Sequence, residues 1–197
     1  MQQKSTEIGL NMIEELSIPG LWIIENHAFP DSRGEFSEWF RSSELTTILR
    51  GNIWTQGNSS RSHKDAIRGI HYSLGDVPQF KLVKCSRGAI LDIIVDLRID
   101  SMNFGQVLSI ELNEQDSKSV LISPGLGHGF ISKESNTIVN YLLTSEYHPE
   151  SENTVNFKKL CSNFLQEETE YFLSEKDESA KTLEEMRDLG LLPVKFY

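Results

Sequence analysis

Short runs of alternating apolar and polar residues, closed by glycine or proline, fill the first three quarters of this chain and constrain its fold most. Alternation with a period of two places apolar side chains on one face of a β-strand. The clearest runs are Leu21–Asn26, Lys81–Cys85, Ala89–Arg98, Val107–Leu112, Val120–Ser123 and Ile138–Thr144. Many short strands with regular turns predict a mainly β protein with the architecture of a β-sandwich or jelly roll.

The chain changes character after about Pro149. Residues 150–178 are mixed and polar, whereas residues 179–189 have helical character, because Leu183 and Met186 are three positions apart with acidic residues between them. A glycine and a proline follow this stretch and are typical of a helix end. We therefore predict a small C-terminal helical tail that packs on the β-sandwich.

The length of 197 residues and the hydrophobic content of 38% are sufficient for one packed core. We predict a single domain over residues 1–197. Its jelly-roll core spans about residues 20–149, and the C-terminal segment with short helices spans about residues 150–197.

Charge and cysteine content exclude several classes of function. The formal net charge is −10, with 19 basic and 29 acidic side chains, so the chain is poorly suited to bind nucleic acid. No apolar stretch is long enough to cross a membrane, and the N-terminus has no export signal. Cys85 and Cys161 show no disulfide spacing, which is typical of a reducing compartment. We therefore expect a cytoplasmic protein without nucleic-acid or membrane partners, and an acidic tail that contributes little to ligand binding.

Polar side chains with different chemistry are concentrated between residues 54 and 71. Amides and hydroxyls recognise neutral polar groups, an arginine grips phosphate, and an imidazole moves protons. The stretch contains Gln56, Asn58, Ser60, Ser62, Arg68 and His71. This combination predicts a site for a polar, phosphorylated ligand.

Two histidines, His71 and His128, raise the possibility of a metal site in a jelly-roll protein. Ser73 occupies the second position of a His-x-His pair, and no carboxylate follows before Lys81. Because two imidazoles beside a lysine make a poor cation site, we predict no metal and no cofactor. A metal-binding cupin remains the alternative.

A pocket with a base and a lysine suits proton abstraction next to a carbonyl group. His71 can take the proton while Lys81 stabilises the enolate oxygen. Tyr141 is a suitable acid for the opposite face, since a phenol stays protonated at neutral pH. Asp177 is a candidate to hold His71 in the correct tautomer.

The ordered motifs resemble those of the dTDP-4-dehydrorhamnose 3,5-epimerase family, which are cofactor-free nucleotide-sugar epimerases with a cupin-type jelly roll. The resemblance covers roughly three quarters of the chain, from Phe29 to Asp177. Its motifs are Phe29–Glu38, Gln56–Asn58, Arg68–Tyr72, Lys81–Val83, Val95–Arg98 with Ser101 and Phe104-Gly105, Pro124–Phe130, Tyr141, Tyr147 and Leu173–Asp177.

The resemblance implies a role for each matching residue. His71 would be the proton-abstracting base with Asp177 as its partner, Tyr141 would be the acid on the opposite face, and Lys81 would contact the 4-keto oxygen. The ligand-binding residues would be Gln56 and Asn58 at the nucleotide, Arg68 at the diphosphate, His128 in the sugar pocket, and Glu152. Arg33, Phe36 and Glu38 would help to bind the nucleotide of a neighbouring subunit, so a homodimer is expected.

Several alternatives stay open at this point. After Tyr147 the chain lacks the Trp-x-Asp-Pro run that is usual in the family, so epimerisation at C3, at C5 or at both carbons is possible. A catalytically silent cupin that binds a nucleotide sugar is an alternative of another class. Tyr141 could be an ordinary core residue, and Arg33 and Glu38 could form a surface ion pair.

Overall fold

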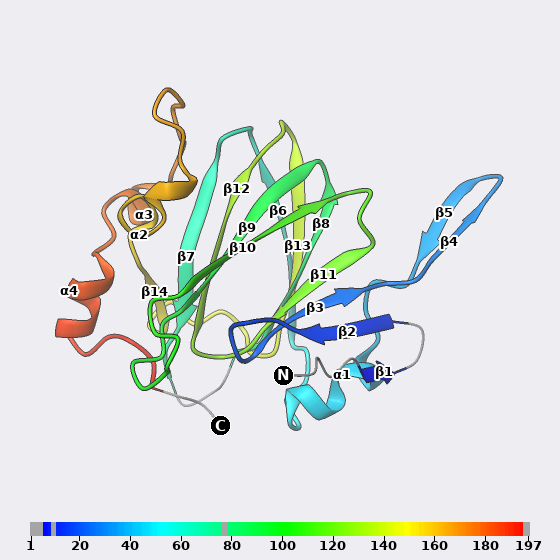
Figure 1. The fold of residues 1–197 in the computed structure, drawn as a ribbon, viewed down its shortest axis with the longest axis horizontal. Helices are drawn as coiled ribbons and strands as arrows, with labels where there is room; N and C mark the ends of the chain where they lie inside the picture. The colour runs from blue at the N-terminus through cyan, green and yellow to red at the C-terminus, as the bar shows by residue number, and fades with distance from the viewer. Residues whose placement is uncertain (1–5, 9–10, 76–78, 195–197) are drawn as a thin grey trace.

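The computed structural model describes residues 6–8, 11–75 and 79–194, and two β-sheets form its body (Figure 1). The first sheet has the order β1-β2-β3-β11-β8-β13-β6, and the second has the order β10-β9-β12-β7-β14. Neighbouring strands in both sheets are antiparallel, and short connections such as Gly88 between β8 and β9 carry the chain repeatedly from one sheet to the other. The prediction of a mainly β sandwich with a small C-terminal helical region is confirmed.

The strands of the first sheet are β1 (Thr6–Ile8), β2 (Asn11–Glu15), β3 (Leu21–Glu25), β11 (Lys118–Ile122), β8 (Lys81–Arg87), β13 (Thr137–Leu143) and β6 (Gln56–Ser62). Those of the second sheet are β10 (Val107–Asn113), β9 (Ala89–Asp96), β12 (Leu126–Ser132), β7 (Ile67–Ser73) and β14 (Glu152–Thr154). The remaining elements are the hairpin strands β4 (Ala28–Asp31) and β5 (Gly34–Ser37), helices α1 (Ser42–Leu49), α2 (Phe157–Leu160), α3 (Glu175–Glu178) and α4 (Leu183–Asp188), and a 3-10 turn at Ser162–Phe164.

The predicted strands agree with the observed ones except at their ends. The polar stretch of residues 54–71 forms two strands, β6 and β7, which belong to different sheets. Its polar side chains therefore come from both sheets.

Each sheet buries apolar side chains on both faces. Residues such as Val83, Ile94 and Val139 fill the space between the sheets. The outer face of the first sheet packs against Leu45 and Leu49 of α1. This layering explains why β9 is apolar at nearly every position, whereas β10, which has an exposed face, alternates.

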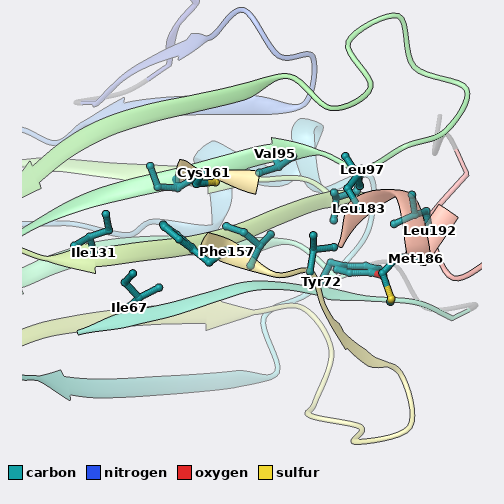
Figure 2. Close-up of a cluster of buried hydrophobic side chains, with 13 residues drawn as sticks. Ile67, Tyr72, Val95, Leu97, Ile131, Phe157, Cys161, Leu183, Met186 and Leu192 are labelled. Carbon is teal, nitrogen blue, oxygen red and sulfur yellow. The ribbon is translucent and has the colours of Figure 1, made fainter. Parts of the chain in front are cut away.

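The outer face of the second sheet is covered by the C-terminal segment, as Figure 1 shows beside β7 and β14. Figure 2 shows the side chains of Leu183, Met186 and Leu192 gathered with Tyr72 and Leu97 of the sheet region. The Tyr72 hydroxyl also donates a hydrogen bond to the backbone carbonyl of residue 191, at 2.7 Å. The tail is therefore part of the core, although most of its acidic side chains are exposed as predicted.

The β4–β5 hairpin extends away from the two sheets in Figure 1. Its phenylalanines, Phe29 and Phe36, are 42% and 66% exposed, and their ring centroids lie 6.3 Å apart. The hairpin and the strands β1 and β2 were not predicted, because their sequences lack clear apolar alternation. Within the described residues, no helix is long and apolar enough to span a membrane.

Candidate active site

A cavity of about 510 Å³ opens between the sheets and is lined by residues from both of them and from the segment before α3. Eight of the residues predicted from the sequence line this cavity: Asn58, Arg68, His71, Lys81, His128, Tyr141, Glu152 and Asp177. Residues that are far apart in the sequence thus meet in one polar pocket, whose size suits a small-molecule ligand.

A histidine–carboxylate pair lies at one side of the cavity. His71 Nε2 is 2.6 Å from Asp177 Oδ1, and the Asp177 side chain is only 4% exposed. Ser174 caps α3 by accepting a hydrogen bond from the Asp177 backbone N–H, which fixes the position of the aspartate. Because the carboxylate accepts a hydrogen from Nε2, the ring's Nδ1 remains as the nitrogen that can accept a proton.

The surroundings of Asp177 favour its charged form. Burial raises the pKa of the carboxyl, but hydrogen bonding and charge from His71, a hydrogen bond from Ser174 and one from the Gly69 backbone N–H together lower the pKa below its ordinary value. The group is therefore a carboxylate at neutral pH and can stabilise a protonated His71.

A second histidine–carboxylate pair faces the same cavity. His128 Nε2 lies 2.7 Å from Asp92 Oδ1, and Asp92 is fully buried. His128 on β12 pairs directly with His71 on β7, so the two imidazoles come from neighbouring strands. Asp92 orients His128 as Asp177 orients His71.

Close backbone contact between β7 and β12 supports this arrangement. Gly69 has φ +100°, and a Cβ there would lie 2.5 Å from the carbonyl oxygen of residue 128 and 2.7 Å from the Cα of Gly129. A side chain at Gly69 would therefore push the strands apart. The register of the two strands also shifts between His128 and Phe130.

Tyr141 comes from β13 in the first sheet, whereas His71 comes from β7 in the second sheet. Its side chain lines the cavity next to Asn58, which lies opposite Tyr141 in the register of β6 and β13. Burial raises the pKa of the Tyr141 phenol, so the group carries its proton at neutral pH. A base and a protonated phenol thus reach the cavity from opposite sheets.

Lys81, on β8, provides a cationic group in the cavity. Burial lowers the pKa of its ammonium group, the charge of Glu152 raises it, and the charge of Lys176 lowers it, with a net decrease. A partly desolvated ammonium interacts strongly with an anion that develops nearby.

Arg68 is held in place at the cavity by two hydrogen bonds to β6. Its Nε donates to Ser62 Oγ at 3.0 Å, and one terminal nitrogen donates to the carbonyl of Arg61 at 3.2 Å. The guanidinium is exposed and retains further donors for an anionic ligand.

Four predicted binding residues do not line the cavity. Gln56 lies behind the cavity wall, where its amide donates a hydrogen bond to Asn58, which does line the cavity. Arg33, Phe36 and Glu38 lie in or next to the protruding hairpin. Arg33 pairs with Asp31, and Glu38 pairs with Arg41, so the alternative of an Arg33–Glu38 ion pair is wrong.

Some cavity residues were missed by the sequence analysis. They include Gln79, Phe130, Tyr147, Phe172 and Lys176, together with Asp92 behind His128. Ser60 of the predicted polar stretch also lines the cavity. Lys176 is adjacent to Asp177, and Tyr147 belongs to a quoted motif, so both could have been proposed from the sequence. In the described part of the chain, no three histidine, cysteine or carboxylate side chains gather where a metal ion could bind.

Comparison with known proteins gives one consistent result. A family model described as dTDP-4-dehydrorhamnose 3,5-epimerase matches residues 15–185. The dTDP-4-dehydrorhamnose 3,5-epimerase of Mycolicibacterium smegmatis is 37% identical, over 91% of this chain and 90% of that protein. A dTDP-4-dehydro-6-deoxyglucose 3-epimerase from a Streptomyces species is also 37% identical, over 91% and 92%.

Solved structures agree with these relatives. NovW, a 4-keto-6-deoxy sugar epimerase from Streptomyces spheroides, superposes with a TM-score of 0.88 at 31% identity, covering 98% of this chain and 96% of that chain. ChmJ, a 3'-monoepimerase from Streptomyces bikiniensis solved in complex with dTDP-quinovose, gives a TM-score of 0.85 at 37% identity, with 91% of each chain covered.

Proposed function

The chain belongs to the dTDP-4-dehydrorhamnose 3,5-epimerase family, and we propose that it is an isomerase that inverts C3, C5 or both carbons of a dTDP-4-keto-6-deoxyhexose in deoxysugar biosynthesis. The observation that carries this proposal is that a His–Asp pair and a phenol approach one cavity from opposite sheets. Inversion of a carbon requires a base on one face and an acid on the other.

The first step is removal of a proton from the carbon next to the ketone. His71 Nδ1 accepts this proton, and the electron pair of the C–H bond moves into the enolate. Asp177 stabilises the resulting imidazolium through the 2.6 Å contact with Nε2. Lys81 lies in the same cavity, and its ammonium group stabilises the negative charge on the enolate oxygen.

The second step returns a proton from the opposite face. Tyr141 donates its hydroxyl proton to the carbon, and the enolate collapses to the ketone with inverted configuration. The raised pKa of the phenol suits this role, because it makes Tyr141 an acid that is protonated before each turnover. His128, held by Asp92, contributes a polar wall to the sugar pocket.

The nucleotide end of the substrate binds at the mouth of the cavity. Arg68 supplies unpaired donors to the diphosphate, which an arginine binds better than a lysine through its planar fork. Tyr147 lines the cavity and is 53% exposed, so it presents an aromatic face on which a nucleobase can stack. Gln56, Asn58 and Glu152 complete the polar surroundings.

The functional unit is a homodimer in which the β4–β5 hairpin reaches the site of the neighbouring subunit. The exposed rings of Phe29 and Phe36 and the side chain of Arg33 support this part of the proposal, because an extended hairpin with apolar rings has little to pack against in its own subunit. A cytoplasmic location stays a prediction.

The test is incubation of the protein with dTDP-4-keto-6-deoxyglucose, with the configuration at C3 and at C5 read separately by NMR. We expect inversion at one or both carbons, and no inversion by the His71→Ala variant, although that variant binds dTDP like the wild type. If the wild type binds the dTDP-sugar and leaves both carbons unchanged, the protein is a silent binder and the proposal is wrong.

A further inference from the structure

A row of hydrogen bonds leads from the chain after β13 toward the Tyr141 hydroxyl. The backbone N–H of Tyr147 donates to Gln56 Oε1 at 2.8 Å. Gln56 Nε2 donates to Asn58 Oδ1 at 3.0 Å. Asn58 lies directly opposite Tyr141 in the register of β6 and β13, and both side chains line the cavity, so the Asn58 amide is placed to donate to the phenol. The direction in which Asn58 shifts the pKa of Tyr141, downward, agrees with this placement. We call Gln56 and Asn58 the amide relay.

The direction of each bond in the amide relay follows from its first member. A backbone N–H can only donate, so the oxygen of Gln56 must face Tyr147, and its NH₂ group must face Asn58. Asn58 Oδ1 is then occupied, which leaves Asn58 Nδ2 to donate to the Tyr141 oxygen. The orientation of both amides is thus fixed by the network.

An amide that donates to the phenol oxygen has two consequences. The Tyr141 hydroxyl does not donate a hydrogen bond to Asn58, so its proton can point into the cavity. After the proton is transferred, the amide N–H stabilises the phenolate, in agreement with the finding that burial raises the pKa of Tyr141 whereas Asn58 lowers it.

We propose that Gln56 and Asn58 are positioning residues that aim the Tyr141 proton at the sugar and thereby control the reprotonation step. This inference rests on the proposed function and assigns the amide relay a task beyond contact with the nucleotide. Proton removal does not involve the relay, because His71 and Asp177 belong to the other side of the cavity.

The inference predicts that loss of the amide relay separates proton exchange with solvent from inversion of the carbon, which normally occur together. His71 still removes the substrate proton, exchanges it with solvent and can return a deuteron to the same face. Tyr141 donates more slowly to the opposite face, and its phenolate afterwards regains a proton from water. The sugar therefore gains deuterium without being inverted.

The experiment compares the wild type with the Asn58→Ala, Gln56→Glu and Asn140→Ala variants in D₂O. NMR of each sample gives the rates of deuterium incorporation and of inversion, and steady-state kinetics give KM. Asn140 is the matched control, because it neighbours Tyr141 on β13 and its amide donates to Ser86 Oγ at 2.7 Å outside the cavity.

For Asn58→Ala we expect the ratio of inversion to exchange to fall about tenfold or more, since a hydrogen bond to a developing charge is lost. Gln56→Glu keeps the side-chain shape but cannot donate, so Asn58 turns its NH₂ toward the new carboxylate and its oxygen toward Tyr141. The phenol then donates to Asn58, and the ratio falls again. Asn140→Ala keeps the wild-type ratio.

Two results would overturn the inference. One is an equal fall of exchange and inversion with a raised KM in both relay variants, which would mean that the amides only bind the nucleotide. The other is a wild-type ratio of inversion to exchange in Gln56→Glu. This second variant keeps the test decisive if Asn58→Ala does not fold. Absence of exchange and inversion in the wild type would instead refute the proposed function, and the inference with it.

Discussion

Replacement of Asp177 by asparagine tests the histidine–carboxylate pair with the smallest change of shape. The amide fits the space of the carboxylate, and the Ser174 cap on the backbone N–H is retained. However, the carboxylate serves two donors, His71 Nε2 at 2.6 Å and, more weakly, the Gly69 N–H at 3.5 Å. The two donors contact different oxygens, Oδ1 and Oδ2, and an asparagine places an NH₂ group at one of these positions, so one donor loses its acceptor.

The expected loss of activity follows from this contact. A hydrogen bond to a charged group contributes about 1.5–3 kcal/mol, which corresponds to roughly a 10- to 150-fold change in rate. If the NH₂ group faces His71, it also selects the tautomer with hydrogen on Nδ1, which cannot accept a proton. We therefore expect a loss toward the upper end of this range.

The assay is the initial rate of deuterium incorporation into a dTDP-4-keto-6-deoxyhexose in D₂O, with dTDP affinity measured by calorimetry as the control. Asp177→Asn should exchange about 10- to 150-fold more slowly than the wild type while binding dTDP normally. An exchange rate within about twofold of the wild type, well below the expected 10-fold minimum, would refute the assignment of Asp177 as the partner of the base.

Three further predictions concern other parts of the molecule. Tyr141→Phe should retain deuterium exchange at the carbon next to the ketone but lose most inversion; an equal loss of both, measured by NMR, would contradict a purely acidic role. Lys81→Met should abolish turnover and yet leave the free energy of unfolding unchanged or higher. The reason is that burial lowers the pKa of Lys81, so its positive charge destabilises the fold at neutral pH and this cost disappears only as pH rises. Urea denaturation checks the sign, and a clearly less stable Lys81→Met would contradict it. Leu183→Ala should lower the free energy of unfolding by about 2–5 kcal/mol, because this side chain is 8% exposed in the core that joins the tail to the second sheet. Glu184→Ala, at an exposed position of the same helix, is its control and should unfold like the wild type.

Much of the fold was predictable because the core strands alternate with a period of two. In Val107–Asn113, for example, Leu108, Ile110 and Leu112 alternate with polar residues, and the strand is found where it was expected. The β4–β5 hairpin gave no such pattern, since most of its side chains are exposed and its rings pack on each other and on His27 outside the buried core. A hairpin that lies outside the buried core leaves no apolar alternation in the sequence.

The candidate site was predictable where motifs carried it and not where tertiary contacts define it. His71, Tyr141 and Asp177 belong to separate motifs, and the structure brings them to one cavity. In the sequence, Asp92 is a polar residue in an otherwise mostly apolar stretch, with no motif to mark it. The pairing of β9 with β12 places it behind His128.

Gln56 and Asn58 were expected at the nucleotide because of the resemblance to the epimerase family. Their direction toward Tyr141 depends on the register of β6 and β13 and on the backbone N–H of residue 147. The packing of the tail was predictable, because the spacing of Leu183 and Met186 indicated a helix whose apolar side faces the sandwich, and these are the two buried residues of α4.

The most direct test of the central claim is deuterium incorporation from D₂O into dTDP-4-keto-6-deoxyglucose by the wild type and by His71→Asn. The claim predicts deuterium at C3, at C5 or at both carbons with the wild type, inversion of each labelled carbon, and no incorporation with His71→Asn. Incorporation at the wild-type rate by His71→Asn would show that another group removes the proton and would contradict the account.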